Sequence, residues 1–447
     1  MGEVEASAAV VAFRESERQM TLGSYRIGRA TITLHPTLTI WDGDGRWLED
    51  AEPAAIAVFL HEYLHYLHNC STFVGVMQTL TTMGLTRLYA QTLDRDGRST
   101  KQLGTSHQAM LVRLQGWWKH FVVRRDAHVI PDTTVAFANL TWTSQPSGPG
   151  VFQEARISTT AVLVGGGKVD LEFTLSVREV EESLAYIFET LVHNGFGGLP
   201  DTAEFVPYRV LPALAAAVAP GITDEDVFRL GCVALNCTNP TVIFMALLDS
   251  CATDGTEATL SLYATGDGFQ EAHDDLERRI GEAENAWTGR GLMEDGVRSF
   301  LAQARALLDE RRSNPWFELE GRPGATGGFM ENVQALVLRH PPCDVMHGHP
   351  PTPVSFGTGD TTRAAEGRRC MDLAADAMFA HLDSRFEFRT DGTARSSCSH
   401  YGFCAHSTKD PTHCMSQPWT SIRFDDPRCL YSHSVMSLLA KIVLTPR

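Results

Sequence analysis

A five-residue metal-binding pattern inside an apolar segment constrains this chain more than any other feature. His61, Glu62 and His65 form the pattern His-Glu-x-x-His, within a stretch from 54 to 67 that is otherwise almost entirely apolar. Residues four apart in an α-helix lie about 40° apart around its axis, so both imidazoles can reach one ion. Unpaired imidazoles and carboxylates are unfavourable in a core, and the neighbouring sequence offers them no other partners. The segment therefore predicts a buried helix that carries part of a metal site.

The residue types in this pattern are those that catalytic zinc requires. Zinc binds neutral imidazole nitrogens and carboxylate oxygens, and a catalytic site keeps three protein ligands and one open position for water. A carboxylate next to the first histidine can take a proton from that water and pass it to a leaving group. We therefore predict zinc held by His61 and His65, with Glu62 as the catalytic base.

A third histidine, His68, follows on the same face of the predicted helix. It is a poor third ligand, because His61 and His68 lie two turns, about 10 Å, apart along the helix axis and one tetrahedral ion cannot bind both readily. We predict that His68 lines the pocket or supports the ligands from outside. In a purely structural site it could instead close the fourth position.

A second helix, expected from about 177 to 193, supplies acidic candidates for the third ligand. Its apolar stripe consists of Val177, Val180, Leu184, Phe188 and Leu191. Glu181 lies at the edge of this stripe, and Glu182 lies on the polar side. Glu189 and His193 share that polar side. If the polar side faces the metal, the ligand is Glu182. If the apolar stripe faces the metal, the ligand is Glu181. We favour Glu182.

The sequence Glu-Ser-Leu-Ala-Tyr-Ile-Phe-Glu at 182–189 resembles the Glu-x-x-Ala-x-x-x-Glu motif of the gluzincin metallopeptidases. That zincin-like group combines His-Glu-x-x-His with a downstream helical glutamate. The resemblance implies zinc bound by His61, His65 and Glu182, Glu62 as the base, and hydrolysis of a peptide bond. It covers two short helices, and here Glu181 occupies the position where the group often has Asn.

Two other classes of function remain open. Glu62 and His65 also match the Glu-x-x-His pair of di-iron carboxylate proteins, but Glu189 and His193 are spaced too widely to form the second pair. A non-haem iron or di-iron oxygenase is therefore one alternative. A non-catalytic interaction protein with a structural zinc is another, although a closed site has no use for a free carboxylate beside its ligand.

The tail of the chain concentrates thiols and imidazoles. Its cysteines are Cys398, Cys404, Cys414 and Cys429, with His400, His406 and His413 among them. They could hold a second metal, either a structural zinc or an iron–sulfur centre. The spacing lacks paired Cys-x-x-Cys units, so buried cysteines and loop histidines are the competing interpretation.

We predict an α+β protein with three regions. Residues 1–205 form a zincin-like catalytic region, with a mixed sheet, a hairpin at 160–173 and the two metal-bearing helices. Residues 206–312 are mainly helical. Residues 313–447 are rich in loops, with one helix at 365–384 and an irregular Cys/His-rich tail.

Charge and composition limit the partners. The chain has 38 basic and 54 acidic residues and a net charge of -16, which disfavours nucleic acid and anionic lipid. It contains no apolar run of the ~20 residues needed to span a bilayer, and its first residues lack an export signal. Ten cysteines are too few for a disulfide scaffold in a chain of this size. We therefore expect a cytoplasmic protein acting on a peptide or small amide.

His193, Tyr186 and Tyr401 are candidates for stabilising an oxyanion.

Overall fold

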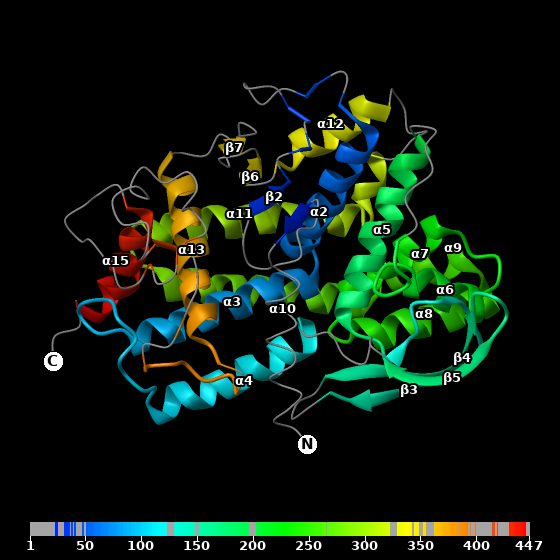
Figure 1. The fold of residues 1–447 in the computed structure, drawn as a ribbon, viewed down its shortest axis with the longest axis horizontal. Helices are drawn as coiled ribbons and strands as arrows, with labels where there is room; N and C mark the ends of the chain where they lie inside the picture. Colours follow the sequence, from blue (N-terminus) through cyan, green and yellow to red (C-terminus); the bar gives the residue numbers. More distant parts are fainter. Residues whose placement is uncertain are drawn as a thin grey trace.

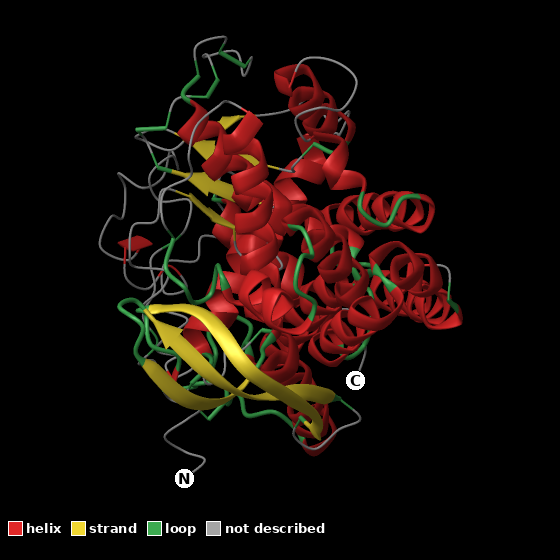
Figure 2. Cartoon of the chain, turned by 90° about the vertical axis from the view of Figure 1, so that its right-hand side faces the viewer, coloured by secondary structure: helices red, strands yellow, loops and turns green. Residues whose placement is uncertain are grey.

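The structure is a computed structural model of a mixed α+β protein that is mostly helical, with two small sheets (Figure 1). The described residues are 23–25, 31–35, 37–38, 40–41, 47–48, 51–122, 129–147, 152–195, 203–264, 266–321, 329–341, 344–347, 352–354, 362–383, 385–391, 394, 398, 414–415, 418 and 429–443. The two sheets lie on different sides of the helical body (Figure 2).

The two helices predicted to carry the metal site are confirmed as helices and pack against each other. Helix α2 spans Pro53–Ser71 and begins with the proline at its first position, where a missing amide hydrogen is harmless. Helix α5 spans Val177–Gly195, and its apolar stripe is buried apart from Leu191, which is partly buried. The two helices contact each other along their length, although more than a hundred residues separate them in the chain.

Helices α3 and α4 follow α2 in the chain. Helix α3 spans Phe73–Thr92, and the Thr72 hydroxyl caps its start by accepting a hydrogen bond from the Gly75 amide. Helix α4 spans Thr105–Phe121. Both pack into the same core as α2, which places the helix of His61 in the middle of the molecule.

The smaller sheet is mixed and joins distant parts of the chain. Its strands are β1 (Gly23–Tyr25), β2 (Thr31–Leu34), β6 (Asp344–His347) and β7 (Thr352–Val354), in the order β1-β2-β6-β7. β2 is parallel to β6, and the other two pairs are antiparallel. Residues 313–447, predicted to be rich in loops, therefore also contain the strands β6 and β7, which the prediction missed. Strands this short have no detectable alternation, and their partner lies at the other end of the chain.

The larger sheet confirms the predicted hairpin. Its antiparallel strands are β3 (Thr134–Pro146), β4 (Gln153–Leu163) and β5 (Lys168–Thr174). The turn between β4 and β5 holds Gly165 and Gly166 at φ values of 86° and 84°, which glycine adopts without strain. β5 leads directly into α5, so this hairpin fixes where the helix of Glu182 begins.

The remaining elements are helices. They are α6 (Val210–Val218), α7 (Asp224–Leu235), α8 (Pro240–Asp254), α9 (Thr256–Ala264), α10 (Asp267–Trp287), α11 (Leu292–Ser313), the 3₁₀-helix η2 (Phe317–Gly321), α12 (Phe329–Arg339), α13 (Thr362–His381) and α15 (Leu430–Val443). The prediction that 206–312 is mainly helical is confirmed, and the helix predicted at 365–384 is present as α13. The prediction of a fully irregular tail is wrong, because α15 packs its apolar side chains against α13 and α11.

The three regions predicted from the sequence share one core. The small sheet pairs β2 with β6, and α11 packs on both α2 and α13. Buried hydrophobic residues from all three regions form one contiguous cluster. Among the described helices, none has both the length and the apolar character needed to cross a bilayer.

Candidate metal centre

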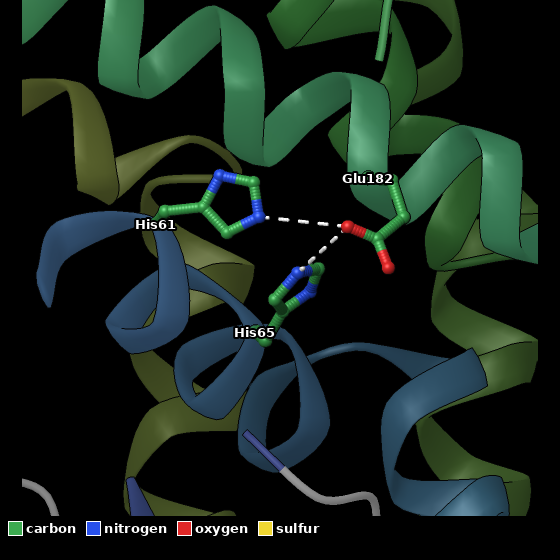
Figure 3. Close-up of side chains that lie close together, drawn as sticks. All are labelled: His61, His65 and Glu182. Atoms are coloured by element: carbon green, nitrogen blue, oxygen red, sulfur yellow. Dashed lines mark ion pairs between the residues drawn. The ribbon is translucent and has the colours of Figure 1, made fainter. Parts of the chain in front are cut away.

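Three donor atoms from two helices meet between α2 and α5. The Nε2 atoms of His61 and His65 each lie 3.5 Å from the same carboxylate oxygen of Glu182, Oε2. Figure 3 shows both imidazoles pointing from α2 toward that oxygen on α5. All three side chains are only partly buried, with 11%, 15% and 17% of the His61, His65 and Glu182 side chains exposed. The group is therefore reachable from solvent.

The phase of α5 determines which glutamate joins the histidines. Glu182 lies on the polar side of the helix, and that side faces α2. Glu181 is buried one position away and accepts hydrogen bonds of 3.0 and 3.2 Å from the Gln78 amide. The structure thus brings Glu182, rather than Glu181, to the two histidines.

A second acidic residue of α5 supports His61 from behind. Glu189 Oε2 lies 3.1 Å from the Nδ1 atom of His61, the ring nitrogen that does not face Glu182. A carboxylate at Nδ1 favours the tautomer with its proton there, which leaves the Nε2 lone pair for a metal. His193 is half-buried further along α5 and is outside this group in the described part of the chain.

Charge interactions keep the carboxylate of Glu182 ionised. Burial alone would raise its pKa, but the charge of His65 and hydrogen bonds from His61 and His65 hold the pKa of Glu182 well below its usual range. The Arg178 guanidinium, 3.4 Å from Glu182 Oε1, acts in the same direction. Burial would lower the pKa of His61, yet Glu182 and Glu189 raise it to about 10 in the metal-free site. This excess of negative charge favours a cation.

Glu62 is half-buried beside the donor group without belonging to it. Strand β1 covers it on one side, and its carboxylate accepts a backbone hydrogen bond from Tyr25. A Cβ atom at Gly23 would lie 2.8 Å from Glu62 Cγ, so only glycine lets the strand approach this closely. Burial raises the pKa of Glu62, against the opposing charges of His61 and His65. Glu62 is therefore positioned by a strand that the motif itself does not contain.

A tyrosine that sequence reasoning missed stands next to the site. The ring of Tyr208 lies 5.9 Å from the ring of His61 and 5.9 Å from that of Tyr186, measured between centroids. Burial and then the charges of Glu182 and Glu62 raise the pKa of its hydroxyl, which stays protonated. No pattern in the sequence connects Tyr208 to the motif. Of the tyrosines predicted to stabilise an oxyanion, Tyr186 lies next to Tyr208 and Tyr401 is outside the described residues.

Two predicted groups fall elsewhere. His68 does not line this site and instead meets Cys232 and Glu318 in a separate, buried group. Of the four tail cysteines, Cys404 lies outside the described residues. Cys398, Cys414 and Cys429 are described, and within the described part of the chain none of them belongs to a cluster of three metal-binding donors.

The donor group fits a divalent transition metal. Two nitrogen or oxygen ligands of one tetrahedral ion, each at about 2.0–2.2 Å, lie roughly 3.3–3.6 Å apart. The two His–Glu182 separations of 3.5 Å match this, and they exceed the usual length of a charge-assisted hydrogen bond, about 2.7–2.9 Å. Comparisons with protein families, with curated proteins and with solved structures find no match to this chain.

Proposed function

We propose that this protein is a zinc-dependent hydrolase of the zincin-like, gluzincin type, cleaving a peptide bond or a related small amide. One observation carries the proposal. The two imidazoles of the His-Glu-x-x-His pattern converge with Glu182 on one point, while the glutamate of the pattern stays outside the donor group. A ligand set with a free carboxylate beside it is the arrangement that metal-assisted hydrolysis needs.

Glu62 moves the proton in this proposal. A zinc ion bound at the three donors would polarise the substrate carbonyl and make a water molecule there more acidic. The carboxylate of Glu62 accepts the proton from the attacking water and delivers it to the leaving nitrogen. Its raised pKa suits a group that must first take and then release a proton. The hydrogen bond from the Tyr25 amide keeps the carboxylate oriented.

Tyr208 is the donor best placed to stabilise the carbonyl oxygen as negative charge develops on it. Its ring borders His61, and its hydroxyl remains a hydrogen-bond donor because the neighbouring carboxylates oppose its ionisation. A donor that already points at the developing charge contributes about 3–4 kcal/mol to transition-state stabilisation in comparable sites. Tyr208→Phe would remove this donor and leave the metal ligands unchanged.

Two observations bear on the alternatives. A closed structural site needs a fourth side chain, and among the described residues no further His, Cys, Asp or Glu joins the three donor atoms. This supports an open, catalytic site. Two histidines and one carboxylate also match the ligand set of mononuclear non-haem iron enzymes, so the identity of the metal separates hydrolase from oxygenase.

The metal content of matched variants tests the ligand set. We compare Glu182→Gln with Glu181→Gln by elemental mass spectrometry of the full-length protein. Glu182→Gln should lose one zinc equivalent relative to wild type, and Glu181→Gln should keep it, because only Glu182 faces the histidines. Equal metal content in both variants, or iron in place of zinc, would refute the proposal. A peptide-library assay with Glu62→Gln as the inactive control then tests the reaction.

A further inference from the structure

A second set of metal-binding side chains lies at the far end of α2. It consists of His68 from α2, Cys232 from α7 and Glu318 from η2, with donor atoms within 4.8 Å of one another. His68 Nε2 is 3.6 Å from Glu318 Oε1 and 3.9 Å from Cys232 Sγ. All three residues have 0% of their surface exposed, so the group is sealed inside the core.

His68 has no adequate hydrogen-bond partner among the described residues. Its Nδ1 atom is buried without a partner, and its Nε2 atom has only the thiol of Cys232 at 3.9 Å. Burial and the nearby Arg311 lower the pKa of His68 well below its usual range, so the imidazole is neutral. A neutral imidazole with an available nitrogen lone pair is a metal ligand, and leaving it unpaired in a core is unfavourable.

Two of the separations between these donors are close to those of ligands on one ion. A nitrogen and a sulfur bound to one ion at about 2.0 and 2.3 Å lie roughly 3.5–3.7 Å apart, in tetrahedral or trigonal geometry. A nitrogen and an oxygen lie roughly 3.3–3.6 Å apart. The observed 3.9 and 3.6 Å require side-chain shifts of only a few tenths of an ångström.

We propose that His68 Nε2, Cys232 Sγ and Glu318 Oε1 bind a thiophilic metal ion, zinc or monovalent copper, as a structural site separate from the candidate catalytic centre. Thiolate and imidazole are the ligands that both of these ions prefer. The site does not depend on the proposed hydrolase, because the two groups share no donor.

The neighbouring Arg311 sets the charge balance of this site. Its guanidinium hydrogen-bonds both carboxylate oxygens of Glu318, and each of those oxygens has two lone pairs, so Oε1 can still bind an ion. Without an ion, Arg311 and Glu318 neutralise each other. Binding replaces the thiol proton of Cys232, which leaves one net positive charge with zinc and none with monovalent copper. The identity of the bound metal will therefore show whether the core holds a net positive charge at this site.

The site would hold the metal-bearing helix in place. Arg311 donates hydrogen bonds of 3.0 and 2.6 Å to the hydroxyl of Ser71, the last residue of α2. An ion shared by α2, α7 and η2 would fix the same helix end through His68. The histidines of the candidate catalytic centre lie on this helix, one and two turns earlier.

The test compares two cysteines only five positions apart. Cys232→Ser removes the proposed thiolate, whereas Cys237→Ser removes a thiol that donates a hydrogen bond to the Val233 carbonyl oxygen. Zinc and copper per chain are measured by elemental mass spectrometry on purified full-length proteins, with circular dichroism to verify folding. We expect Cys232→Ser to lose one metal equivalent, and Cys237→Ser and Glu182→Gln each to keep that equivalent. Unchanged metal content in folded Cys232→Ser protein would overturn the proposal.

A spectroscopic readout decides the question if Cys232→Ser does not fold. The candidate catalytic centre contains no thiolate, so in protein expressed with cobalt only a cysteine ligand gives a sulfur-to-cobalt charge-transfer band. The band is measured in wild type and in Cys398→Ser, which identifies any contribution from the tail. A band in both proteins supports the buried site. A band absent from wild-type protein that holds no copper, or a band lost in Cys398→Ser, overturns it.

Discussion

Helix α2 contributes histidines to two groups of potential metal-binding side chains, which differ in exposure, in their donors and in the charged residue beside them. The His61 group has side chains that are 11–17% exposed and a free glutamate beside it. The His68 group is wholly buried, and its neighbour is Arg311. A substrate can reach the first group only. Access and the charge of the neighbouring side chain, rather than the spacing of histidines along a helix, are what distinguish the group proposed to be catalytic from the group proposed to be structural.

The largest expected effect is on catalysis at the exposed group. Glu62→Gln removes the proton acceptor and retains the shape of the side chain, so kcat should fall about 10²–10⁴-fold while the metal content stays at the wild-type level. The measurement is turnover on the best substrate from the peptide library, together with elemental analysis. Glu204→Gln, on an exposed residue, is the matched control. A wild-type kcat in Glu62→Gln would show that Glu62 is not the proton acceptor, and the His61 group would lose its proposed catalytic role.

The next largest effect is on stability at the buried group. Arg311→Met leaves the Glu318 carboxylate buried without its cation, and the free energy of unfolding should fall by about 3–5 kcal/mol. Arg312→Met is the control, because Arg312 makes its ion pair with Asp309 at the surface and should lose less than about 1 kcal/mol. Urea denaturation measures both. Similar losses in the two variants would mean that the buried network does not support the core.

The sequence could predict the parts of the molecule that depend on local periodicity. The helical phase of 177–193 placed Glu182, Glu189 and His193 on one side, and the structure turns that side toward α2. The helices of the middle region were predictable for the same reason. The roles of His61, His65 and Glu182 as zinc ligands remain predictions that the metal analysis tests.

The parts that could not be predicted depend on contacts between distant segments. Cys232 and Glu318 reach His68 only because α7 and η2 fold back onto α2, and no spacing rule links them. Strand β1 is three residues long, so neither its pairing nor the approach of Gly23 to Glu62 leaves a pattern. Tyr208 likewise belongs to no sequence pattern that would link it to the site. Such contacts are determined by packing of the whole chain, which a single sequence does not display.

Adjacent glutamates on α5 give a third, smaller contrast, one of pH dependence. In metal-free protein, Glu181 ionises near pH 7 when folded and near 4.5 when unfolded, because burial is the largest influence on its pKa. The Glu181 carboxyl group therefore binds its proton more tightly in the folded protein than in the unfolded protein. The stability that this group contributes is complete below pH 4.5 and is lost as the pH rises to 7, by an amount on the order of 3 kcal/mol. Glu181→Gln should abolish this loss.

Glu182 provides the control of opposite sign for the same experiment. Its folded pKa is held below the ordinary value, so its stabilisation is present above pH 4.5 and is lost as the pH falls through the folded value. Unfolding is measured from pH 4 to 8 with a chelator present. Relative to wild type, Glu181→Gln should gain stability toward pH 8, and Glu182→Gln should be less stable there. The same pH profile in both variants would contradict the assignment of Glu181 to the core and Glu182 to the metal.

The smallest effect concerns the support of His61. Its Nδ1 atom contacts Glu189 at 3.1 Å, whereas Nδ1 of His68 is buried without a partner among the described residues. Removing a carboxylate behind a ligand histidine typically weakens metal binding 10–100-fold, or about 1.4–2.7 kcal/mol. Glu189→Ala should show that loss in a competition assay with a chelator, and Glu189→Gln, which can still accept the hydrogen bond, should lose less. Equal affinities in both variants and wild type would mean that His61 needs no such support, and His61 and His68 would then differ in burial alone.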